Sequence, residues 1–187
     1  PESGVSNPVT SVLLNFRAYD TLLELAVLLA ALLGIWSTGP AVGGFVAAGS
    51  LLRSLTATVV PLLILTAGYM LWVGGHAPGG AFQAGALLAA AGVALRLAGR
   101  PRAGLPRLPL LRGVTVLGVL AFTAVGLTLM AAGTGFLTFP IAIAKWLILA
   151  IETAATLAIG ATLAAAYLAG EPAAAASHSD RPGGGGH

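Results

Sequence analysis

The stretch FPIAIAKWLILAIETAATLAIGATLAAAY, residues 139–167, decides the fold class. It is an apolar run longer than the roughly 20 residues that an α-helix needs to cross the hydrocarbon core of a bilayer. Polar and apolar residues do not alternate along it, as they would in a half-buried β-strand. Its only charged residues are Lys145 and Glu152. The stretch therefore predicts a transmembrane helix that carries two charges.

Similar runs occur along the whole chain. The 187 residues are 57% hydrophobic and 8% charged, whereas a soluble domain normally has about 25% charged residues. The expected helices cover about 9–37, 54–74, 81–99, 112–132 and 139–169. We therefore predict an all-α integral membrane protein with about five transmembrane helices and no β-sheet.

Five of the nine basic residues lie in one connection, between the third and fourth runs. They are Arg96, Arg100, Arg102, Arg107 and Arg112. No aromatic residues are interleaved with them, so we do not expect a nucleic-acid interface. By the positive-inside rule the connection is cytoplasmic, which predicts an N-terminus outside and a C-terminus in the cytoplasm.

The segments between and after these runs are read from their composition. Residues 38–50 contain Gly-Pro and Gly-Gly pairs and are expected to be a linker, while the Ala/Gly/Ser/Pro-rich tail, 170–187, is expected to be disordered. Residues 1–10 lack a basic region ahead of the first run, so no cleavable signal peptide is expected. The chain has no cysteine, which excludes disulfides and cysteine ligation of iron–sulfur clusters within it. We expect no catalytic site, metal site or cofactor.

The first expected helix carries Arg17, Asp20 and Glu24, spaced by three and then four residues. This spacing puts all three on one helical face, where Arg17 can pair with one carboxylate at a time. A carboxylate that is buried without a partner favours its protonated form, so Asp20 and Glu24 are candidates for reversible proton binding, with Glu24 the deeper of the two. The alternative is a fixed ion-pair network that docks this helix onto a neighbour.

Lys145 and Glu152 are seven residues apart and share one face of the last helix. Their axial separation is about 10 Å, so direct contact would be a stretch. With Thr153 and Thr156 beside them, they are candidates for a polar axis that carries protons or ions. The alternative is a salt bridge to the charged face of the first helix.

The stretch GHAPGGAFQAG, residues 75–85, separates the second and third runs. Its glycines permit backbone angles that other residues avoid, and proline fixes another, so a tight structural turn is predicted. The residues assigned to this turn are His76, Pro78, Gly79, Gly80 and Gly85. The alternative for His76 is a pH-sensitive gate, because histidine can change its charge near neutral pH.

This stretch resembles the GH-x-PGGGF-x-x-G signature of the MnhB/MrpB family, the B subunit of multisubunit Mrp-type Na⁺/H⁺ antiporters, which has relatives in membrane-bound hydrogenases. The resemblance covers about 51–169, and Ala81 replaces the third consecutive glycine. Separately, NFRAYDTLLELAV (15–27) resembles a segment at the C-terminal end of the large A subunit, with Asn15 where Asp is common. The chain thus resembles a fusion of an A-subunit tail helix (1–37) with a four-helix B subunit. Its last helix is unlike the common B-subunit ending.

The resemblance implies an accessory subunit of a cation/proton antiporter in the cytoplasmic membrane of a bacterium or archaeon. Large antiporter-like subunits and small membrane subunits would be its partners, Na⁺ and/or H⁺ its ions, and the glutamate of the first-helix pattern, here Glu24, part of the ion path. Two alternatives stay open. The chain could belong to the membrane arm of a redox complex such as a membrane-bound hydrogenase, or it could be a purely structural spacer.

Overall fold

The computed structural model describes residues 8, 18–39, 48–100, 103–133 and 135–169. In these ranges the regular structure is helical, and no strand is present. The helices are α2 (Ala18–Thr38), α3 (Ser50–Val73), α4 (Ala81–Leu97), α5 (Leu108–Ala131) and α6 (Ile141–Ala169). The prediction of an all-α protein with about five helices is confirmed.

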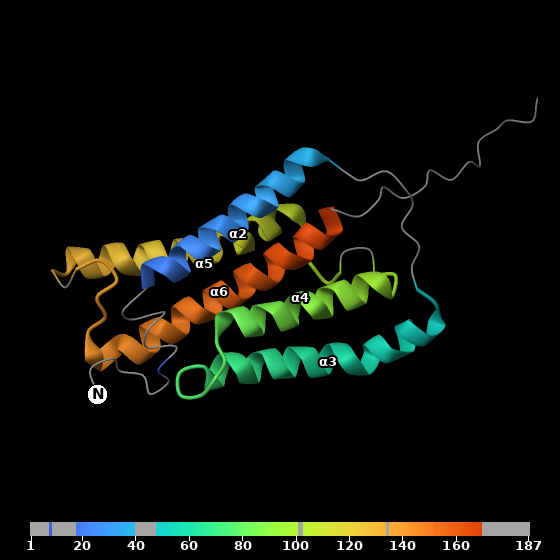
Figure 1. The fold of residues 1–187 in the computed structure, drawn as a ribbon, viewed down its shortest axis with the longest axis horizontal. Coiled ribbons are helices and arrows are strands. Elements are labelled where there is room, and N and C mark those ends of the chain that lie inside the picture. Colours follow the sequence, from blue (N-terminus) through green and yellow to red (C-terminus); the bar gives the residue numbers. More distant parts are fainter. Residues whose placement is uncertain (1–7, 9–17, 40–47, 101–102, 134, 170–187) are drawn as a thin grey trace, which may run out of the picture.

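Helix α6 lies at the centre of the bundle (Figure 1). It packs against α2, α4 and α5, and touches α3, which packs mainly on α4. The largest side chains that are fully buried come from α2, α5 and α6, and Phe122 of α5 is completely enclosed. The bundle therefore has two sides, with α2 and α5 on one side of α6 and α4 and α3 on the other.

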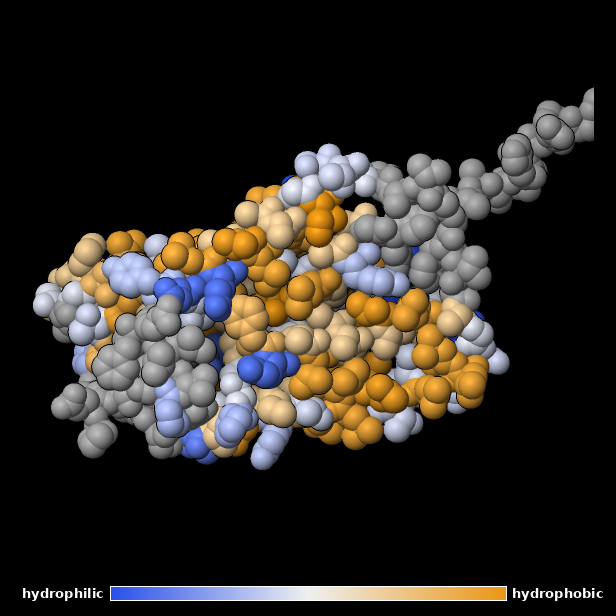
Figure 2. Space-filling view, viewed as in Figure 1, coloured by the Kyte–Doolittle hydropathy of each residue, from blue (hydrophilic) through white to orange (hydrophobic). Residues whose placement is uncertain are grey.

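The outer faces of the helices are apolar, as they must be if they meet lipid. Apolar residues cover most of the face in Figure 2, and the strongly hydrophilic residues gather in a few patches toward the end where α2 begins. Four helices are long and apolar enough to cross a membrane, whereas α4 has 17 residues. The chain is a multi-pass membrane protein.

Several helix boundaries differ from the predicted ones for local reasons. Helix α5 begins at Leu108 rather than near 112, because Pro109 is accommodated in the first turn, where its missing N–H is not needed. Helix α4 ends at Leu97 because Gly99 turns the chain with a φ of +93°. Helix α3 begins at Ser50, within the predicted linker, and keeps Pro61 inside it. The predicted start of the first helix (9–17) and the predicted disordered tail lie outside the described residues.

Small residues bring α4 and α6 into close contact. A Cβ at Gly85 would lie 2.7 Å from Ile159, and one at Gly160 would lie 3.0 Å from the Cβ of Leu88. Backbones approach this closely only where side chains are absent, which is how membrane helices associate without a hydrophobic driving force. Gly85, assigned to the turn from sequence, belongs instead to α4 and to this contact.

The connections gather at two ends of the bundle (Figure 1). The loop between α3 and α4 lies at the same end as the start of α2 and the connection from α5 to α6. The connection from α4 to α5, which is rich in arginine, lies at the other end, with the ends of α2 and α6. The histidine loop and the arginine connection are therefore separated by the length of the bundle.

Candidate functional site

The loop from Gly74 to Gly80 folds back onto the C-terminal end of α3. The N–H of Gly80 donates to the carbonyl of Met70 (3.1 Å), and the N–H groups of His76 and Ala77 donate to Val73 (3.0 and 2.9 Å). A Cβ at Gly79 would lie 2.6 Å from the Met70 carbonyl oxygen, so only glycine fits there. The predicted tight turn is present, and it leaves His76 exposed.

Gly80, the last residue before α4, has a φ of +124° and provides no side chain to cap the helix. The first N–H groups of a helix have no partner within the helix, so an acceptor has to come from elsewhere. Here it is Glu152 of α6: the N–H of Ala81, the first residue of α4, donates to its carboxylate. A Cβ at Gly80 would lie only 3.1 Å from Oε1 of Glu152.

Glu152 is only 4% exposed. The positive end of the α4 dipole therefore lies against this enclosed carboxyl group. One turn further along α6, Thr156 is also buried, and its hydroxyl has no hydrogen-bond partner among the described residues. Thr153, by contrast, is exposed and donates to its own helix at Leu149.

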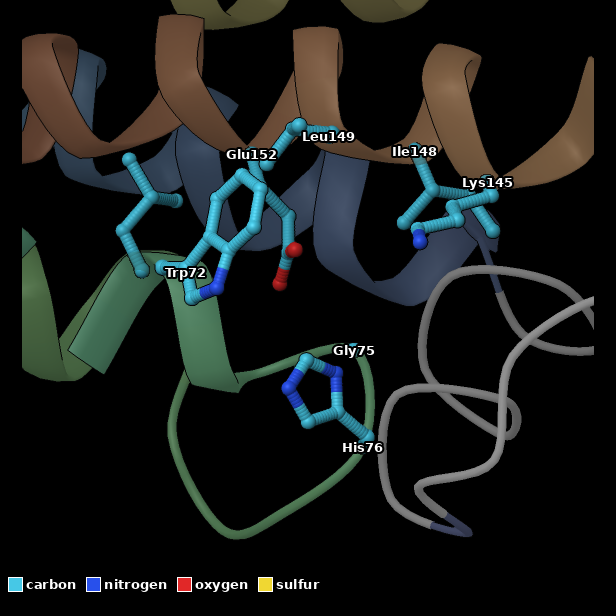
Figure 3. A pocket seen from close by; sticks show the side chains of 8 residues that line it. Trp72, Gly75, His76, Lys145, Ile148, Leu149 and Glu152 are labelled. Carbon is cyan, nitrogen blue, oxygen red and sulfur yellow. The ribbon is translucent and has the colours of Figure 1, made fainter. Parts of the chain in front are cut away.

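A small pocket of about 40 Å³ lies in front of Glu152. This is enough for a few waters. Glu152 points from α6 toward the α3–α4 loop, the ring of His76 lies across from it, and Lys145 borders the same space (Figure 3). Trp72 of α3 forms part of the wall. The structure thus brings together the loop histidine and both charged residues of α6.

Lys145 is exposed at the mouth of this pocket, with its Nζ 5.8 Å from the centroid of the Trp146 ring. Although Lys145 and Glu152 line one pocket, they do not form a direct ion pair. Neither residue pairs directly with Glu24, and the other form of the alternative, a salt bridge from Glu152 to Arg17, falls outside the described residues. Lys145 and Glu152 face the α3–α4 loop instead.

The charged residues of α2 lie apart from this pocket. Asp20 is half-buried and takes part in a polar interaction, while Glu24 is exposed on the surface of the chain. The residues of α2 that turn inward are Ala18, Thr21, Leu25 and Leu32. Arg17 lies outside the described residues. Glu24 is thus not enclosed by the described residues of this chain.

Sequence reasoning missed the pairing of Glu152 with the start of α4. A usable signal was present, because the helix after Gly79-Gly80 begins with Ala-Phe-Gln and has no Ser, Thr, Asp or Asn to cap it. Such a helix start, placed inside a membrane protein, requires an acceptor from another segment.

A family model described as a domain related to the MnhB subunit of Na⁺/H⁺ antiporter matches residues 51–169. The chain belongs to this MnhB-related family. The match contains the histidine loop, the whole of α4 and Glu152. The residues that line the pocket therefore all lie within the matched region, whereas α2 precedes it.

Two solved structures are similar to this chain. One chain of the Mrp complex from Dietzia sp. DQ12-45-1b has 28% sequence identity to this chain and a TM-score of 0.70. The match covers 97% of this chain and 22% of the Dietzia chain. This chain thus spans about a fifth of the Dietzia chain. A chain of the membrane-bound sulfane sulfur reductase, an archaeal respiratory membrane complex, shares the fold with a TM-score of 0.75 and 22% sequence identity. The match covers 90% of this chain and 79% of the reductase chain. No curated protein sequence matches the chain.

Proposed function

We propose that the chain is an accessory membrane subunit of a multisubunit Na⁺/H⁺ antiporter complex, and that Glu152 contributes to its proton or ion path. The observation that carries this proposal is the nearly complete burial of Glu152 beside a pocket that Lys145 and His76 also line. Ionisable residues inside membrane proteins are costly, and they commonly mark ion or proton pathways.

The surroundings of Glu152 suit a group that exchanges a proton or a cation. The Ala81 N–H and the dipole of α4 stabilise the carboxylate when it binds neither a proton nor a cation. A proton or Na⁺ that arrives through the pocket neutralises it. Water in the pocket would link the Glu152 carboxylate to Lys145 and His76. Both of these residues lie near the outer end of α6 in the proposed orientation.

The exposure of Glu24 supports a role for partner subunits. It lies almost two turns into α2, on the outer surface of the isolated chain. A charged side chain that faced lipid at this depth would be costly, so we propose that a neighbouring subunit covers it. Glu24, Asp20 and Arg17 would then line the path at that interface, as the family resemblance implies.

We also propose that residues 1–37 correspond to an A-subunit tail helix joined through 38–50 to the MnhB-related domain. The Dietzia match supports this arrangement, since it covers 97% of this chain on a single chain of the Mrp complex, although the family model begins only at residue 51. The arginine connection would face the cytoplasm and the histidine loop the outside of a prokaryotic cytoplasmic membrane.

The experiment is antiport by the assembled complex in membrane vesicles, measured as the Na⁺-driven change in a pH gradient. Glu152→Gln retains an acceptor for Ala81 and removes the charge, so we expect assembly without antiport. Thr153→Ala is the matched control on α6, because that hydroxyl bonds only within its own helix, and it should transport normally. Normal antiport by the Glu24→Gln/Glu152→Gln double variant would contradict the proposal and favour a structural spacer.

A second candidate function is the membrane arm of a respiratory complex, since the same fold occurs in the sulfane sulfur reductase. Gentle detergent extraction distinguishes the two candidates through the proteins that stay bound. Antiporter-like subunits alone support the first function. Partners that carry iron–sulfur clusters or nickel support the second.

A further inference from the structure

A second pocket lies at the other end of the molecule, between α3 and α4. Its volume is about 620 Å³, and Arg53, Thr56 and Arg100 are on its walls. Both arginines are exposed, and neither guanidinium has an ion-pair or hydrogen-bond partner among the described residues. The pocket is thus open, positively charged and distant from Glu152.

The backbone holds the two arginines in place. Arg53 is in the first turn of α3, where the helix dipole favours an anion. Arg100 follows Gly99 in a Schellman motif at the end of α4. The N–H of Arg100 donates to the carbonyl of Leu95 (3.0 Å), and the N–H of Gly99 donates to the carbonyl of Arg96 (2.9 Å). These bonds occupy carbonyls that would otherwise repel an anion. The Ala48 N–H donates to the Leu97 carbonyl (2.9 Å), which joins the start of α3 to the end of α4.

An apolar groove of about 340 Å³ lies next to this pocket and shares two wall residues with it, Val60 and Leu95. The groove is lined by large apolar side chains such as Ile64 and Leu88 and by small residues such as Gly92. Arg53 on the wall of the pocket and Ile64 on the wall of the groove are eleven residues apart on α3, which is about 16 Å at 1.5 Å per residue. A charged pocket therefore lies beside an apolar groove, and the two together extend over part of the length of an acyl chain.

We propose that this site binds one anionic phospholipid, with its phosphate between Arg53 and Arg100 and an acyl chain in the groove. Guanidinium groups bind phosphate oxygens in a planar, bidentate manner. Basic pockets between membrane helices bind the head groups of anionic lipids. Inorganic phosphate would satisfy the arginines and leave the groove without a role, which is why the wall shared by the pocket and the groove favours a lipid.

The test uses the complex extracted with its partner subunits and delipidated. Dioleoyl phosphatidylglycerol, dioleoyl phosphatidylcholine or inorganic phosphate is then added, and bound molecules are detected by native mass spectrometry. We expect preferential binding of phosphatidylglycerol. The double variant Arg53→Gln/Arg100→Gln should weaken this binding about thirtyfold, from the contribution of two arginines near a head group. The control Arg107→Gln/Arg112→Gln removes the same charge from outside the pocket and should change it little.

A second pair of variants tests the groove. Ile64→Trp fills the groove, whereas Leu65→Trp places the same side chain at a position that is 70% exposed and outside it. Only the first should lower phosphatidylglycerol binding. Four outcomes would each overturn the proposal. Two of them are equal binding of the two lipids and equal loss of binding in both arginine variants. The other two are equal effects of both tryptophan variants and competition by inorganic phosphate that is as strong as competition by lipid.

Discussion

Glu152 of α6 accepts a hydrogen bond from the backbone N–H of Ala81, the first residue of α4. Seventy-one positions separate these residues in the sequence, and the bond joins the histidine loop to the central helix. It gives one carboxylate two roles. Glu152 completes the start of a neighbouring helix, and it presents its carboxyl group to a pocket inside the bundle.

The capping role predicts a stability difference between two neutral replacements of Glu152. Glu152→Gln keeps an oxygen for the Ala81 N–H, whereas Glu152→Leu has a similar volume and leaves that N–H without a partner. We expect the leucine variant to be less stable than the glutamine variant by about 1–3 kcal/mol. Thermal unfolding in detergent measures this. Equal unfolding midpoints would show that Glu152 does not cap α4.

The fold of the loop predicts that its glycines differ in importance. Gly79→Ala would place a methyl group 2.6 Å from the Met70 carbonyl oxygen and should cost about 1–3 kcal/mol through backbone displacement. Gly75→Ala is the matched control, since nothing lies within 4 Å of its Cβ position, and it should change the unfolding free energy by less than about 0.5 kcal/mol. Similar losses in both variants would contradict this account of the loop.

A third prediction concerns the contact between α4 and α6. Gly85→Ala should destabilise the chain by about 1–3 kcal/mol, because the new methyl group would collide with Ile159. Gly68→Ala in α3 meets open space and should be neutral or stabilising by up to about 1 kcal/mol, through its higher helix propensity. Chemical unfolding of the two variants checks the order, and a less stable Gly68→Ala would argue against it.

The proposed orientation can be tested directly because the chain has no cysteine. Pro78→Cys and Arg107→Cys each introduce one thiol at an exposed position, at opposite ends of the bundle. In intact cells, a maleimide that does not cross membranes should label the thiol at 78 and leave the thiol at 107 unlabelled until the membrane is opened. The reverse pattern would invert the topology.

The histidine also has a specific test. If His76 acts as a gate for the pocket, His76→Gln should shift the pH profile of antiport, because glutamine hydrogen-bonds but does not take up a proton near neutral pH. An unchanged profile with normal activity would leave His76 as a structural part of the turn. Antiport is measured across a series of external pH values in the same vesicles used for Glu152→Gln.

The sequence by itself determined the fold class, the approximate helices, the turn at 75–80 and the family. These depend on local properties: the length of apolar runs, the absence of alternation, and the backbone freedom of glycine. It also marked Lys145 and Glu152 as unusual, because a charge within a long apolar run is conspicuous at any position.

Only the tertiary structure decided what those charges face. One helix carries Glu152, a second begins at Ala81, and the loop between α3 and α4 carries His76, so their meeting depends on how α4 packs on α6 through Gly85 and Gly160. The packing of α2 on α5 and α6 leaves Glu24 on the outside, whereas Glu152 is enclosed, although both glutamates lie within apolar helices. Helical periodicity predicts which residues share a face, but the neighbour that covers the face is set by contacts between distant segments.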